Sequence, residues 1–176
     1  MNLAYLHIVI NHFPIMGVPI GVGLLALGAY ARNEAIKRAA LLVFVAIGIA
    51  TIGVYLAGRG GEDFVEHLAG VSEDAIERHE HMAGVALFAT EALALLSLVV
   101  FARFGGPAML SRGPEAVTAR SVPGWAVATV LIAGLVTAGV LGYTGKLGGQ
   151  IRHVEFVPGG AAALQVDEHE EAGDDD

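Results

Sequence analysis

Four long segments of the chain are almost free of charged side chains, and this feature constrains the fold more than any other. The segments are residues 3–30, 39–58, 81–102 and 122–145. A helix needs about 20 predominantly apolar residues to cross the hydrocarbon core of a bilayer, and each segment is long enough. We therefore expect an all-α integral membrane protein, a four-helix bundle formed by residues 1–155.

The composition agrees with a membrane protein. Charged residues make up 16 % of the chain, whereas soluble domains carry about a quarter. The absence of cysteine removes disulfides, thiolate metal sites, iron–sulfur clusters and covalently attached haem. The net charge of −8 argues against nucleic acid as a partner. Much of it lies in residues 156–176, which we expect to form an acidic, disordered tail.

The first segment is interpreted as a span and not as a signal peptide, because it has no basic leader. Pro14 and Pro19 interrupt it, and each removes a helical hydrogen bond, so we expect bends there. We expect the third helix to begin before the membrane, with Ser72 as its N-cap, and to cover residues 73–101. The preceding residues 62–69 predict a short amphipathic helix.

Lysine and arginine are distributed unequally between the two sides of this predicted bundle. Six lie in the first and third loops: Arg32, Lys37, Arg38, Arg103, Arg112 and Arg120. Four lie on the opposite side: Arg59, Arg78, Lys146 and Arg152. Positive charge near the spans marks the cytoplasmic side of a membrane protein. Both termini are therefore expected on the outer side.

With this topology, every histidine falls on the outer side or in the outer half of a span. The seven are His7, His12, His67, His79, His81, His153 and His169. Imidazole is a usual ligand of haem iron, copper and zinc, and ionisable groups within a bilayer usually mark function. A single interfacial histidine often only hydrogen-bonds, and we expect no more than that of His67 and His169.

The predicted site joins His7 or His12 of the first span to His79 or His81 of the third. His79 and His81 are two residues apart and point to nearly opposite faces of a helix, so only one can face inward. His7 and His12 are about 140° apart around the axis, which favours one ligand per helix. Such an arrangement suits a flat cofactor clamped between helices. We therefore predict b-type haem in a membrane-bound electron-transfer protein, with His153 folding over the opening.

Two alternatives stay open. The histidines, with Glu77 and Glu80 nearby, would instead bind a transition metal ion such as copper, zinc or iron. The candidate metal ligands are then His7, His12, His79 and His153. The other alternative is a cofactor-free anchoring subunit of a respiratory complex. No catalytic triad or phosphate loop is visible, so an electron-transfer subunit is favoured over a stand-alone enzyme.

Glu91 lies deep inside the third predicted span, about three turns below His81. A carboxylate there is costly unless it is protonated or paired. It is therefore a candidate proton or quinone site. The alternative is a neutral group that donates a hydrogen bond to a facing carbonyl.

Three motifs resemble an uncharacterised bacterial family of four-helix membrane proteins. Residues 7–14, HIVINHFP, resemble its HxxxNHFP opening. Residues 70–80 resemble its GVSE…ExHE entry to the third helix, and residues 147–155 resemble its closing LGGxIRHxE. From the charge bias and the predicted haem, we expect a multi-pass protein of the bacterial inner (cytoplasmic) membrane with periplasmic termini and a periplasmic redox partner. The resemblance covers residues 7–155 and implies membership of this bacterial four-helix membrane family. Its motif histidines map onto His7, His12, His79 and His153, while His81 and Val154 depart from the pattern.

Overall fold

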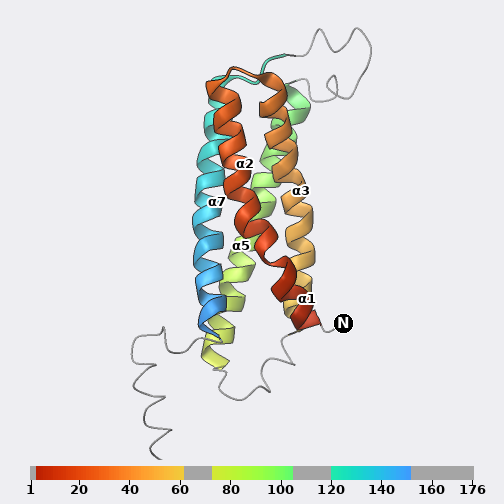
Figure 1. Cartoon of the computed structure of the whole chain (residues 1–176), viewed down its shortest axis with the longest axis vertical. Helices are drawn as coiled ribbons and strands as arrows, with labels where there is room; N and C mark the ends of the chain where they lie inside the picture. The colour runs from red at the N-terminus through yellow and green to blue at the C-terminus, as the bar shows by residue number, and fades with distance from the viewer. Residues whose placement is uncertain (1–2, 62–72, 105–119, 152–176) are drawn as a thin grey trace, which may run out of the picture.

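The computed structural model describes residues 3–61, 73–104 and 120–151, and this part of the chain contains helices and no strand. The helices are α1 (Leu3–Ile10), α2 (His12–Tyr30), α3 (Glu34–Arg59), α5 (Glu73–Arg103) and α7 (Gly124–Gln150). Helices α1 and α2 follow each other as one rod, so the described residues form four rods (Figure 1). Each rod is long and apolar enough to cross a membrane. The predicted all-α class and the four candidate spans are confirmed.

Several predicted features lie outside the described residues. They are the amphipathic helix at 62–69, the Ser72 cap, the tail at 156–176, and His67, His153 and His169. The third helix does begin at Glu73, with two acids in its first turn, as predicted.

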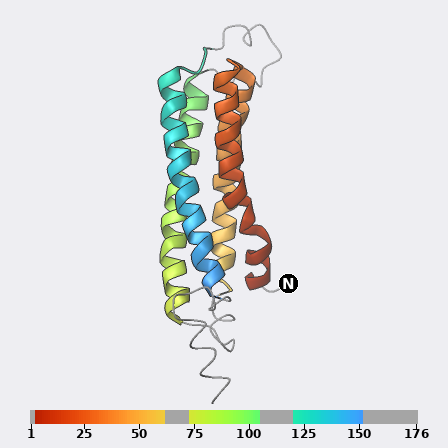
Figure 2. The same cartoon turned by 60° about the vertical axis from the view of Figure 1, so that its left-hand side comes forward.

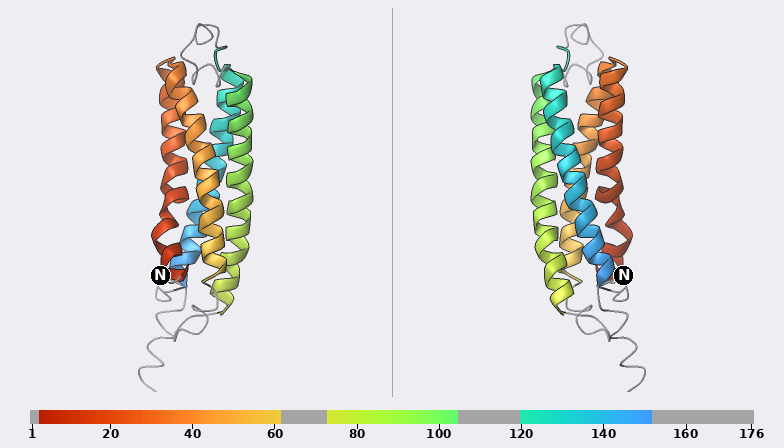
Figure 3. Two further views of the ribbon diagram at one scale, coloured as in Figure 1. Left: turned by 90° about the vertical axis from the view of Figure 1, so that its right-hand side faces the viewer. Right: turned by 90° about the vertical axis from the view of Figure 1, so that its left-hand side faces the viewer.

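The four rods stand side by side as an antiparallel bundle (Figures 2 and 3). Helix α3 packs against α2 and α5, and α7 packs against the same two helices from the other side. Helices α2 and α5 therefore occupy opposite corners. We call the end with His7, Arg59 and His79 the histidine end, and the end with Arg32 and Arg120 the arginine end.

The first rod is broken at Asn11, where α1 turns into α2 (Figure 1). Pro14 follows in the first turn of α2, a position that tolerates proline, and its missing N–H leaves the carbonyl of Ile10 without its helical donor. The Asn11 N–H still donates to the His7 carbonyl at 2.9 Å. Helix α2 then continues through Pro19. The break expected from Pro14 is present, whereas Pro19 does not interrupt the helix.

Large apolar side chains cover the outside of the bundle as well as its core. Phe44 and Leu93 are fully buried, while Phe13, Phe88 and Leu135 are more than half exposed. A water-soluble bundle would carry polar side chains on that outer face. The outer surface therefore suits contact with lipid chains. Exposed aromatic residues lie near both ends, as expected of interfacial anchors: Tyr5, Tyr30, Trp125 and Tyr143.

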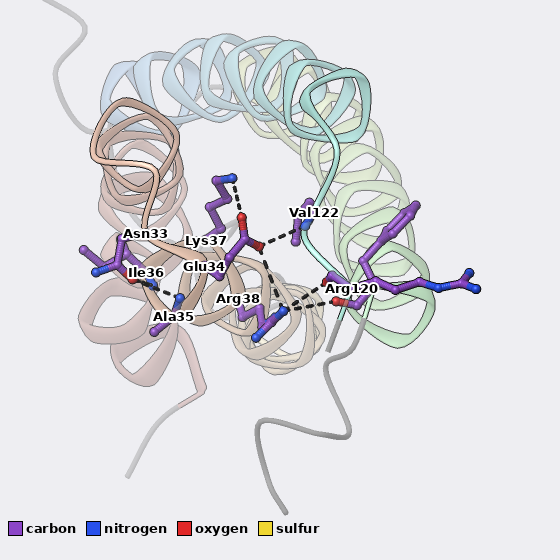
Figure 4. Close-up of polar contacts among 9 residues, drawn as sticks. Asn33, Glu34, Ala35, Ile36, Lys37, Arg38, Arg120 and Val122 are labelled. Carbon is purple, nitrogen blue, oxygen red and sulfur yellow. Dashed lines mark hydrogen bonds and ion pairs between the residues drawn. The ribbon is translucent and has the colours of Figure 1, made fainter. Parts of the chain in front are cut away.

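A hydrogen-bonded cluster around Arg38 joins three rods at the arginine end (Figure 4). The Arg38 guanidinium is buried and donates to the carbonyl of Arg120 at 3.0 Å and to that of Phe104 at 3.5 Å. Glu34, one turn earlier on α3, accepts from the Val122 N–H at 2.9 Å. The cluster thus ties the end of α5 and the approach to α7 to the start of α3.

Candidate functional site

Two of the predicted site residues, His7 and His79, meet at the histidine end. Their ring centroids are 6.3 Å apart, and the rings are nearly perpendicular, at 78°. Both side chains are partly buried. Because α1 and α5 belong to opposite corners of the bundle, the two imidazoles approach each other across its interior. We call His7 and His79 the histidine pair.

A backbone carbonyl of a neighbouring helix holds each ring of the histidine pair. His7 Nδ1 lies 2.9 Å from the carbonyl oxygen of Val54 on α3, and His79 Nδ1 lies 3.1 Å from that of Thr144 on α7. A carbonyl only accepts, so each Nδ1 carries the proton and donates. In an imidazole with its single proton on Nδ1, the Nε2 atom keeps its lone pair. Metal-binding histidines are commonly oriented in this way.

Two glycines let the neighbouring helices approach the rings closely. A Cβ at Gly58 on α3 would lie 2.9 Å from His7 Nδ1, and a Cβ at Gly148 on α7 would lie 3.0 Å from His79 Cε1. Both distances are shorter than ordinary contacts of a side chain. The orientation of the histidine pair therefore depends on the absence of a side chain at both positions.

The two acids that the sequence offered as metal ligands, Glu77 and Glu80, do not join the histidine pair. Glu80 forms an ion pair with Arg59, which links the end of α3 to the start of α5 beside the histidine pair. Glu77 is exposed. Within residues 3–61, 73–104 and 120–151, no group of three or more histidine, aspartate or glutamate side chains is arranged to hold a metal ion.

The other two described histidines do not join the pair. His12 is exposed on the outside of the bundle, because the break at Asn11 and the five-residue spacing turn it away from His7. His81 is exposed at the start of α5, on the face away from His79, as the two-residue spacing predicts. Glu91 lies twelve positions beyond His79 on α5, about 18 Å along the helix.

The histidine pair fits haem by its donor set, because imidazole is a usual ligand of haem iron. It offers two imidazoles from two helices, each with Nδ1 held by a backbone carbonyl and with no hydrogen bond to Nε2 in the described part of the chain.

A comparison of the chain with protein-family models, curated proteins and solved structures finds no match. The motif resemblance therefore stays a prediction, and the function is argued from the chemistry of the histidine pair.

Proposed function

We propose that this chain is a membrane-bound electron-transfer protein that holds b-type haem through His7 and His79. The observation that carries the proposal is the pair itself: two imidazoles from opposite corners of the bundle, each with Nδ1 held by a carbonyl and with no hydrogen bond to Nε2 among the described residues. A bound haem would supply a one-electron couple. The chain supplies the two ligands and fixes their tautomer. The hydrogen bonds donated by Nδ1–H also make each Nε2 a stronger electron-pair donor to a metal.

The histidine end is proposed to face the outer, periplasmic side of a bacterial inner membrane. The support comes from positive charge, which is concentrated at the opposite end on Arg32, Lys37, Arg38, Arg103 and Arg120. Basic residues near spans favour the cytoplasmic side. In this orientation a periplasmic protein would exchange electrons with the histidine pair, and the quinone pool or an oxidase would be the other partner.

One observation favours a second candidate, a transition metal ion without porphyrin. Gly58 and Gly148 bring helix backbone against the two rings, and an ion needs less room between the helices than a macrocycle does. Imidazole suits copper, zinc and iron. Further ligands beyond the pair would be required, since structural metal sites usually have four.

An absorption spectrum of the purified full-length protein, produced with an adequate haem supply, separates these candidates. We expect a red preparation with a reduced-minus-oxidised spectrum of b-type haem and iron bound in proportion to haem. Elemental analysis that finds stoichiometric metal in a preparation without porphyrin would select the second candidate. A colourless, metal-free protein that takes up neither haem nor metal on reconstitution would remove both.

A further inference from the structure

Glu91 is the only Asp, Glu, Lys, Arg or His in the central portions of the four rods. These portions are residues 13–30, 39–58, 82–102 and 124–145. Each side chain capable of full charge elsewhere in the spans lies near one of the two ends of the bundle. An ionisable group in the middle of a membrane span is costly and usually has a function.

The carboxyl group of Glu91 lies in the seam between α5 and α3, opposite a glycine. A Cβ at Gly48 would lie 3.3 Å from Glu91 Oε2, 3.7 Å from Oε1 and 2.6 Å from the Ala94 Cβ. The missing side chain at Gly48 therefore leaves room both for the carboxyl group and for the close contact of the two helices. Glu91 is only partly buried, so it lies at the edge of the seam and is not sealed in the core.

Glu91 has no polar partner in the described part of the chain. Its Oε1 atom is enclosed and accepts no hydrogen bond there, and no ion pair of the carboxyl group is formed. The basic side chains at the ends of α3 and α5 either interact with other groups or lie far from Glu91. On α3, Arg59 pairs with Glu80, and Arg38 donates to carbonyls. On α5 itself, Arg103 lies twelve positions away, about 18 Å along the helix.

The helices farther from this seam supply no counter-ion either. Helix α2 has no charged residue beyond His12, and the single charged residue of α7 is Lys146, which is exposed in its last two turns. A carboxylate without a counter-ion or donor in apolar surroundings is strongly disfavoured relative to the neutral acid. A neutral carboxylic acid carries no charge, so it can occupy this place without a counter-ion.

We propose that Glu91 is an intramembrane proton-binding site, which takes up and releases one proton at the α3–α5 seam. The reaction is the association of a proton with the carboxylate, with no other bond made or broken. Because Glu91 is only partly buried, its carboxyl group is not enclosed by the rods on every side. This proposal does not depend on the histidine pair binding haem.

Infrared spectroscopy of the full-length protein in a detergent without carbonyl groups tests the proposal without any cofactor. At neutral pH, solvated Asp and Glu side chains are ionised and do not give the carbonyl-stretch band of a protonated carboxylic acid. We therefore expect one such band, from Glu91. Glu91→Gln should remove this band, and the control Glu80→Gln should keep it. Labelling the wild-type protein with ¹³C-glutamate should shift the band, which identifies a glutamate even where the Glu91→Gln variant fails to fold.

Transfer to D₂O distinguishes an exchangeable proton from a trapped one. We expect the band to shift downward after overnight exchange in the folded protein. A wild-type spectrum without the band, a band that survives Glu91→Gln, or a band that D₂O leaves unshifted would each overturn the proposal. A protein that takes up no haem on reconstitution but shows the exchangeable band would reject the haem and retain the proton site.

Discussion

The imidazoles of His7 and His79 meet edge to face with centroids 6.3 Å apart, although their helices stand at opposite corners of the bundle. The carbonyls that hold them belong to the other two corners, at Val54 on α3 and Thr144 on α7. All four rods therefore contribute to the geometry of one pair of rings. A site supported in this way by rigid helices is well suited to fix the orientation of a ligand.

Replacement of either member of the histidine pair should abolish cofactor binding. His7→Ala and His79→Ala each remove one of the two free Nε2 atoms, so we expect both variants to lose the haem spectrum. His12→Ala and His81→Ala serve as matched controls, because these histidines are exposed outside the bundle. The haem content per protein after purification in detergent is the measurement.

The controls make the assignment of ligands specific. Haem content should remain within about twofold of wild type in His12→Ala and His81→Ala, because surface substitutions away from a site have small effects. Loss of haem from His12→Ala together with its retention in His7→Ala would show that the first rod supplies His12 of α2, and not His7, as the ligand.

A methyl group at Gly58 should disturb the histidine pair. In Gly58→Ala the new Cβ would lie 2.9 Å from His7 Nδ1, and in Gly148→Ala 3.0 Å from a ring atom of His79. Such overpacking costs about 1–3 kcal/mol, and it acts on rings that are already fixed by carbonyls. We expect both variants to unfold at lower temperature in detergent and to bind cofactor less tightly.

Glycines in open positions provide the comparison. Gly53 and Gly149 belong to the same two helices, and a Cβ at either would meet nothing within 4 Å. Alanine should therefore keep or raise stability there, by up to about 1 kcal/mol from helix propensity. Equal destabilisation by all four substitutions would mean that the ring contacts are not the cause.

The Arg38 cluster should contribute strongly to the stability of the arginine end. Arg38→Met keeps an unbranched side chain, shorter than that of arginine, but removes the donors to the Arg120 and Phe104 carbonyls and leaves Glu34 without one of its nearby cations. We expect a loss of about 2–3 kcal/mol in the free energy of unfolding. Arg103→Met, an exposed control, should change it by less than about 0.5 kcal/mol. Equal losses in both variants would contradict this role.

Apolar composition predicted the rods but not their full length. The segments at 39–58 and 122–145 correspond to helices Glu34–Arg59 and Gly124–Gln150. Hydropathy marks the part of a helix that lipid can cover, whereas the ends continue with polar residues. At the start of α3, Asn33 accepts from the N–H groups of Ala35 and Ile36 and so begins the helix before its apolar run.

The sequence reduced the candidates for the histidine pair to two on each of two spans, but it could not identify which two meet. The two-residue spacing of His79 and His81 predicts that one faces inward, and His79 does. The choice between His7 and His12 depends on the break at Asn11, whose effect on the helix phase follows from packing and not from residue type. Nothing in the sequence indicated that the carbonyls of Val54 and Thr144 accept from the two rings, because every residue carries the same backbone acceptor.

The orientation of the bundle can be measured directly, because the chain has no cysteine. Single cysteines at two exposed positions, Glu77→Cys near the histidine end and Ser121→Cys near the arginine end, report on opposite sides of the same membrane. From the bias of positive charge, we expect a membrane-impermeant maleimide to label Glu77→Cys on intact spheroplasts and Ser121→Cys only after permeabilisation. The cysteine-free parent controls for background labelling. The reverse pattern would put the histidine pair on the cytoplasmic side and would remove a periplasmic electron-transfer partner from the proposed function.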